Sequence, residues 1–262
     1  MKNFKHYLLA CRDLAKDASI QIREAWQSRD IPFKFQKTED EVIITGYKSS
    51  LLPRIEVPGE ILGFPVRTVG ARAFVECPFL EEVRIADGVE ILEANAFSSC
   101  THLTKVFMGD SVSVIGRNAF FECKYLYCVE LSPSLREIDN RAFFGCTGLG
   151  DIYLPDGIER IGDQAFYGCT KLKSIHIPTS VEHLSGGLFS HIPDDVEIYF
   201  AEGSPFEAKN GYVISKDGKQ LIYYSKGNTA ESFTVSNGCE LKFDWFEAKS
   251  DSLGNMIATK KL

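Results

Sequence analysis

The amino-acid sequence predicts a β-rich solenoid with short parallel strands, an N-terminal helix and an inserted β-hairpin. Three observations lead to this prediction: a motif that returns every 23 residues, an apolar alternation inside each copy, and flanking segments that depart from the motif. A fixed period of about 20–50 residues is typical of architectures in which each unit buries its apolar side against the next.

Residues 1–30 precede the repeat and carry one apolar face at helical spacing. The apolar positions alternate three and four residues apart over about residues 3–28: Phe4, Leu8, Cys11, Ala15, Ala18, Ile22 and Ala25. Because the ends of a solenoid expose apolar surface, we expect this helix to act as a cap. A dimerisation helix is the alternative, which would make the protein a homodimer, since the same spacing suits a helix pair.

The remaining residues, 31–262, are predicted to form the solenoid and its additions. Residues 31–47 have the pattern of a β-hairpin that turns near Glu39 and Asp40. A first degenerate strand follows at Ile55–Val57, before the strict copies begin.

The strict copies share an Ala-Phe pair, then a cysteine and a leucine at intervals of three residues. The pair begins at Ala73, Ala96, Ala119, Ala142 and Ala165. After each leucine, two apolar residues alternate with outward ones, which is the pattern of a short strand with one buried face. Since so small a unit cannot bury its own apolar side, we expect stacked coils with parallel strands about 4.8 Å apart.

Degenerate copies and one interruption complete the predicted chain. Leu188-Phe189 replaces the Ala-Phe pair, and Ile198 and Phe200 occupy strand positions. Residues 211–224 surround a Lys-Asp-Gly-Lys turn and are expected to form an inserted hairpin. Residues 240–262 are expected to form a last, degenerate turn of the solenoid.

The frame A-F-x-x-C-x-x-L-x-x-I-x-I-P-x-x-[IV]-x-x-I-G resembles the BspA-type leucine-rich repeat family. The likeness covers about residues 31–240 and makes the expected fold a leucine-rich-repeat solenoid. The resemblance implies a non-enzymatic binding protein, often at the surface of host-associated bacteria or protists and linked with adhesion. It brings no shared catalytic residues.

Composition limits the partners and the compartment. The net charge of -7 and the pI near 5.4 argue against nucleic acid. No apolar run approaches the roughly 18–20 residues of a membrane span, so no membrane insertion is expected. Lys5 and His6 precede the apolar stretch Tyr7–Cys11, and Arg12 and Asp13 follow it, so the stretch is too short for a signal peptide and none is expected. The chain is therefore predicted to be cytoplasmic, whereas the resemblance implies a cell-surface or secreted protein. An altered export signal is a third interpretation of the N-terminal segment.

Five of the eight cysteines follow the repeat. The first and fourth would lie roughly 14 Å apart in the stack, whereas zinc needs its ligands about 2.0–2.3 Å from one point. We expect buried thiols, with disulfides or a metal as alternatives. Cys128 stands apart, because it precedes the inward Val129 and is expected to be a partly exposed thiol.

With no recognisable catalytic motif around the histidines, neither an enzyme nor a cofactor is predicted.

The outward side of the strands is the candidate site. One outward position per coil would form a row across the sheet: Arg84, Phe107, Glu130, Tyr153, His176 and Tyr199. A neighbouring polar row contains Cys128, Asp151, Ser174 and Glu197. Aromatic residues also suit exposed strand positions without any ligand, which is the structural explanation. The functional hypothesis is a protein partner bound through this face, since aromatic residues anchor interfaces. A glycan bound by the same rings is one alternative, and a scaffold that self-assembles through the N-terminal helix is another.

Overall fold

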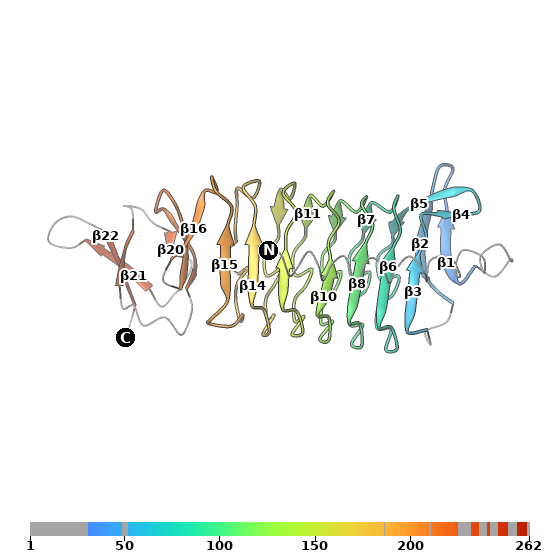
Figure 1. Cartoon of the computed structure of the whole chain (residues 1–262), viewed down its shortest axis with the longest axis horizontal. Coiled ribbons are helices and arrows are strands. Elements are labelled where there is room, and N and C mark those ends of the chain that lie inside the picture. The colour runs from blue at the N-terminus through green and yellow to red at the C-terminus, as the bar shows by residue number, and fades with distance from the viewer. Residues whose placement is uncertain are drawn as a thin grey trace.

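A computed structural model describes residues 31–48, 52–185, 187–209, 211–224, 232–235, 240–241, 246–250 and 256–260. Over these residues the chain winds into an elongated stack of coils that runs from β1 at one end to the C-terminal strands at the other (Figure 1). The predicted repeat solenoid is confirmed. The helix expected over residues 1–30 lies outside the described residues.

Two series of parallel strands follow the coils. The parallel strands of the first series are β2 (Val42–Tyr47), β5 (Phe64–Val69), β7 (Ile91–Leu92), β9 (Val114–Ile115), β11 (Glu137–Ile138) and β13 (Arg160–Ile161). Two strands join this sheet in antiparallel pairs: β1 (Phe33–Lys37) pairs with β2, and β4 (Glu60–Ile61) pairs with β5. The second joins β3 (Arg54–Val57), β6 (Glu82–Ile85), β8 (Lys105–Met108) and β10 (Cys128–Glu130), followed by a separate sheet of β12 (Asp151–Tyr153), β14 (Ser174–Ile177) and β15 (Glu197–Phe200). Between strict copies the paired residues are 23 apart, so the period of the sequence sets the register.

Stacked phenylalanine rings fill the centre of the coils. The ring of each Ala-Phe pair is fully buried and lies parallel to the next, with centroids 5.0–5.5 Å apart: Phe74, Phe97, Phe120, Phe143 and Phe166. Each buried ring contributes roughly 1.5–3 kcal/mol to stability. Phe33 of β1 meets Phe74 edge-on, and Tyr223 meets Phe189 edge-on at the other end.

Four of the five repeated cysteines form the expected ladder of buried thiols, whereas Cys77 in the first strict copy is only half-buried. The side chains of Cys100, Cys123, Cys146 and Cys169 are fully buried. Each thiol donates to the carbonyl oxygen of the phenylalanine in the preceding coil, at Sγ–O distances of 3.0–3.4 Å. Burial raises the pKa of Cys123 and Cys169 to about 12. The described cysteines form no disulfide. The thiols therefore hold neighbouring coils together as hydrogen-bond donors.

Each coil reverses through two residues with left-handed backbone. One precedes the Ala-Phe pair, as at Asn95 with φ 58°, and the other precedes the cysteine, as at Ser99 with φ 60°. Glycine occupies the second position in two coils, at Gly145 and Gly168. Glycine adopts this conformation without the steric penalty that other residues incur.

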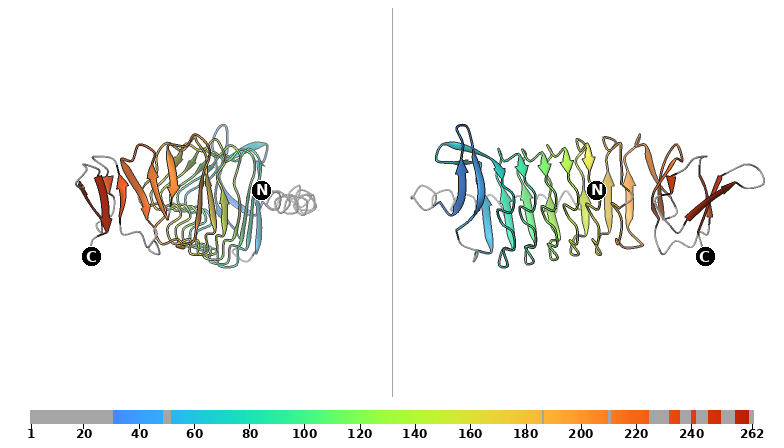
Figure 2. Two further views of the ribbon diagram at one scale, coloured as in Figure 1. Left: turned by 60° about the vertical axis from the view of Figure 1, so that its left-hand side comes forward. Right: turned by 180° about the vertical axis from the view of Figure 1, so that it is seen from behind.

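The C-terminal strands depart from the coil pattern. The inserted hairpin is present as the antiparallel pair β17 (Tyr212–Ser215) and β18 (Gln220–Tyr224), with β16 (Phe206–Lys209) antiparallel to β17 and β20 (Glu240–Leu241) parallel to β18. Beyond it, β22 (Met256–Lys260) pairs antiparallel with both β19 (Ser232–Val235) and β21 (Phe246–Ser250) (Figure 2). Within the range 240–262, where a degenerate solenoid turn is expected, the structure describes β20, β21 and β22, and much of the range lies outside the described residues.

Candidate functional site

The predicted outward row forms two groups rather than one. Arg84, Phe107 and Glu130 are register partners on β6, β8 and β10, and Tyr153, His176 and Tyr199 are partners on β12, β14 and β15. However, β10 and β12, both fully described, belong to different sheets. Gly150 immediately precedes β12 and Gly148 lies two residues earlier, and glycine weakens strand pairing.

The second group is a column of parallel rings, which we name the aromatic triad: Tyr153, His176 and Tyr199. Ring centroids lie 4.5 Å apart between Tyr153 and His176 and 4.7 Å apart between His176 and Tyr199, with interplanar angles of 12° and 16°. The spacing follows that of parallel strands. Both faces of the imidazole are therefore covered, and Tyr199 is 44% exposed.

Carboxylates lie beside the aromatic triad. The hydroxyl of Ser174 donates to Asp151 at 2.8 Å, and the phenol of Tyr199 donates to Glu197 at 2.6 Å. That hydrogen bond raises the pKa of Tyr199. Burial lowers the pKa of His176 and outweighs the opposite effect of Asp151 and Glu197. The imidazole is therefore mainly neutral near pH 7, and this end of the face is acidic.

The first group has a different character. The guanidinium of Arg84 lies over the ring of Phe107, 4.3 Å from its centroid, and forms a 2.7 Å ion pair with Glu82. The charge of Arg84 is thus balanced locally. Glu130 is half-buried at the end of β10.

Cys128 corrects one expectation. Its neighbour Val129 packs against the core, so Cys128 lies on the outward face as predicted. The side chain is nevertheless only 8% exposed, not partly exposed as expected. The side chain is short, and its register partner on β8 is the longer Lys105.

Two further aromatic clusters were not predicted from the sequence. At the start of the strands, three side chains are highly exposed: Phe79, Tyr125 and Tyr127. After the Ala-Phe pairs, a ladder of rings runs along a different side of the coils, with consecutive centroids 5.0, 4.5 and 4.4 Å apart: Phe121, Phe144, Tyr167 and His191. We name this second cluster the flank ladder. The first three ladder positions are 23 residues apart in the sequence. This spacing could have predicted the ladder, but a search restricted to the strands does not include these positions.

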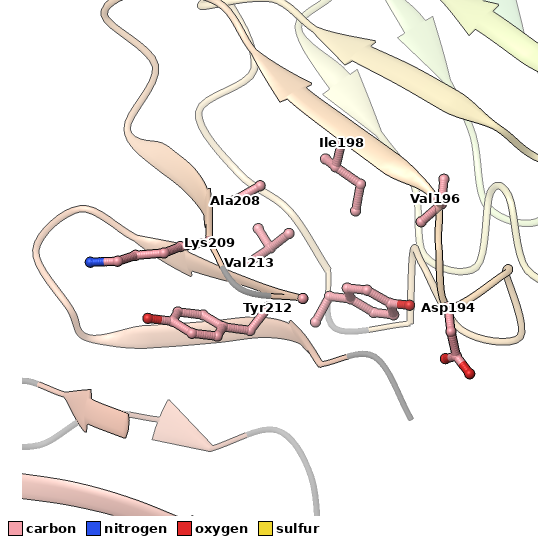
Figure 3. A pocket seen from close by; sticks show the side chains of 9 residues that line it. Asp194, Val196, Ile198, Ala208, Lys209, Tyr212 and Val213 are labelled. Carbon is pink, nitrogen blue, oxygen red and sulfur yellow. The ribbon is translucent and has the colours of Figure 1, made fainter. Parts of the chain in front are cut away.

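A cavity of about 180 Å³ lies where the last coil meets the hairpin sheet. Val196 and Ile198 line one side, and Ala208 and Val213 line the other (Figure 3). Small-molecule sites usually measure about 300–1,000 Å³, so this cavity is too small for such a ligand. Among the residues that the structure describes, no group of His, Cys, Asp and Glu is arranged to hold a metal ion.

Comparison with known proteins identifies the family. Residues 67–194 match the BspA type leucine rich repeat region in six copies. A solved leucine rich repeat protein of T. pallidum shares 31% identity with a TM-score of 0.61, over 64% of this chain and 79% of that one. The chain belongs to the BspA-type leucine-rich repeat family.

Two other solved structures resemble this BspA-type protein. A leucine rich cell surface protein of Faecalibacterium prausnitzii shares 26% identity with a TM-score of 0.63, over 80% of this chain and 64% of that one. A leucine-rich repeat protein of Bacteroides ovatus shares 30% identity with a TM-score of 0.57, over 64% of this chain and 45% of that one. No curated protein matches significantly. Within the described part of the BspA-type chain, no helix has the length and apolar character of a membrane span.

Proposed function

We propose that this BspA-type protein is a non-enzymatic module that binds a protein partner, in adhesion or host interaction, through the sheet face around the aromatic triad. The observation that carries the proposal is the stacked column of Tyr153, His176 and Tyr199 beside carboxylates, at positions that the repeat leaves variable. The relative from Faecalibacterium prausnitzii is described as a cell surface protein, which agrees with such a role.

The ring geometry favours a protein partner over a glycan. A sugar stacks on an open aromatic face, but within the aromatic triad both faces of His176 and one face of each tyrosine are covered. Stacked rings present their edges and polar atoms outward. Edges, hydroxyls and flanking carboxylates suit side chains and backbone groups of a protein.

The charge of the face indicates the chemistry of the partner. Asp151 and Glu197 are exposed, and the adjacent imidazole of His176 is mainly neutral at pH 7. A complementary partner would present lysine, arginine or other hydrogen-bond donors to this end of the sheet. Binding would then weaken as the salt concentration rises.

The test begins with capture of protein partners on the immobilised full chain. We expect the double substitution Tyr153→Ala and Tyr199→Ala to weaken binding of a captured partner at least about thirtyfold, as for interface anchors. The matched control is Tyr125→Ala, which removes another exposed tyrosine. Unchanged affinity in the double variant, with thermal stability retained, would refute the assignment of the site.

The two alternatives have their own readouts. A glycan array bound by the wild type and not by the double variant would favour the carbohydrate hypothesis. Light scattering that increases with concentration only when residues 1–30 are present would favour the self-assembling scaffold.

A further inference from the structure

The flank ladder is not a requirement of the repeat. In other coils the same position, directly after the Ala-Phe pair or its equivalent, is occupied by Val75, Ser98 and Ser190. In three consecutive coils it is aromatic, and those rings are only half-buried. Such a local run of apolar rings on one side of a solenoid indicates a surface that contacts another segment.

The ladder begins close to the place where the described chain starts. Phe33 of β1 touches Phe74, and Phe121 belongs to the coil two steps further along the stack. At about 4.8 Å per coil, the ladder extends from roughly 10 Å to roughly 25 Å beyond Phe74.

The segment before residue 31 has the length and pattern to cover this distance. A helix over residues 3–28 would be about 39 Å long. Its apolar stripe would place Ile22, Ala18 and Ala15 between about 12 and 23 Å from residue 30. Alanine side chains are small and let a helix approach the outward edges of these rings closely. Residues 1–30 also contain six basic and four acidic residues, in a chain with net charge -7, so the segment is opposite in charge to the remainder.

We propose that the apolar side of residues 3–28 docks along the flank ladder of the same chain. This inference goes beyond the proposed function, since it concerns another side of the coils. It differs from a cap on the end of the stack and from a dimer of two such helices. Docking there would leave the sheet face with the aromatic triad accessible to a partner.

Tryptophan fluorescence provides the test. The chain has two tryptophans, Trp26 and Trp245, so the full-length Trp245→Phe variant reports on Trp26 alone. Trp26 follows Ile22 by four residues and therefore borders the apolar stripe. We expect its emission to be blue-shifted and independent of protein concentration. Adding Phe144→Ser and Tyr167→Ser should shift the emission to longer wavelength.

The substitutions are chosen to preserve the fold. Serine already occupies the ladder position at Ser98 and Ser190, so the coils accept it. As a second readout, trypsin should cleave after Lys16 and Arg23 about tenfold faster in the ladder variant, because undocking exposes the segment. The matched control, Tyr153→Ser with Tyr199→Ser, removes two rings from the sheet face and should change neither signal.

Three results would overturn the proposal. Emission and cleavage that do not respond to the ladder substitutions would indicate that the segment lies elsewhere, as a cap or undocked. An emission that varies with concentration, together with a dimer in sedimentation, would assign the segment to a second copy. An emission typical of exposed tryptophan in the parent variant would exclude docking altogether.

Discussion

The thiol of Cys146 donates a hydrogen bond to the carbonyl oxygen of Phe120 in the preceding coil, with a Sγ–O distance of 3.1 Å. The same carbonyl also accepts the backbone N–H of Cys123 at 3.2 Å. The cysteine side chain thus joins one coil to the turn of the coil before it. This explains why cysteine, rather than another small apolar residue, suits the position: it fills the space and supplies a weak donor.

We predict that Cys146→Ala lowers the free energy of unfolding by about 1–2 kcal/mol, because it removes buried volume and one hydrogen bond. Urea denaturation would measure the loss. Thr147→Ala is the control, since it removes a solvent-accessible bond between coils, from Thr147 to the carbonyl of Lys124. Its expected effect is below about 1 kcal/mol. Equal losses in the two variants would contradict a special role for the buried thiol.

A second prediction concerns alkaline pH. Burial raises the pKa of Cys123 and Cys169 from 9.0 to about 12, so the unfolded chain loses these protons at lower pH than the folded chain. Stability should be unaffected by these groups below pH 9 and should fall between pH 9 and 12. The slope is about 1.4 kcal/mol per pH unit for each thiol. Denaturation across this range should give a shallower slope for the Cys123→Ala/Cys169→Ala variant than for the wild type.

The left-handed residues allow a reciprocal pair of substitutions at one position of the coil. Ser99→Gly removes the strain of a side chain at φ 60° and should stabilise the protein by about 0.5–1 kcal/mol. Gly168→Ala introduces that strain at φ 73° and should destabilise it by about 1 kcal/mol. Space is not limiting there, since the nearest atom to an added Cβ is 3.7 Å away. Shifts of the same sign in the two melting temperatures would refute this explanation.

His176 should titrate below its ordinary pKa of 6.5, since burial between two tyrosine rings disfavours the imidazolium. The stability that this contributes is present above pH 6.5 and is lost as the pH falls through the lower folded-state pKa. NMR of the imidazole protons would measure the titration directly. In the Tyr153→Ala/Tyr199→Ala variant the pKa should move upward, because burial decreases while Asp151 and Glu197 remain.

The sequence predicted the coil and its register well because neighbouring coils are nearly identical. Once the period is 23, the pairing of Tyr153 with His176 follows from counting. Properties that depend on neighbouring side chains were harder to predict from the sequence. The burial of Cys128 depends on the side chains beside it, and the break between β10 and β12 falls where the period is unchanged.

The ends of the chain and the second ladder were harder still. The antiparallel pairing of β21 with β22 lies outside the repeat, so the period carries no information about it. In the sequence, the flank ladder can be recognised as aromatic residues that follow the Ala-Phe pairs. A search for alternating apolar residues in strands does not detect them, because they lie in turns. The repeat predicts the features that all coils have in common. Features found in only some coils have to be located in the three-dimensional structure.

Inclined rings flank the strict copies on both sides, and they bear on how the number of coils in such a solenoid can change. Phe33 and Tyr223 belong to segments outside the strict copies. The ring of Phe33 is nearly perpendicular to Phe74 at one end of the stack, and the ring of Tyr223 is inclined by 64° to Phe189 of the degenerate copy. Neither ring therefore continues the column of parallel rings. Gain or loss of one 23-residue unit in the middle would change the length of the sheet face by about 4.8 Å and leave both ends intact. The length of the solenoid can thus change in whole steps of one coil, while the segments at its two ends stay the same.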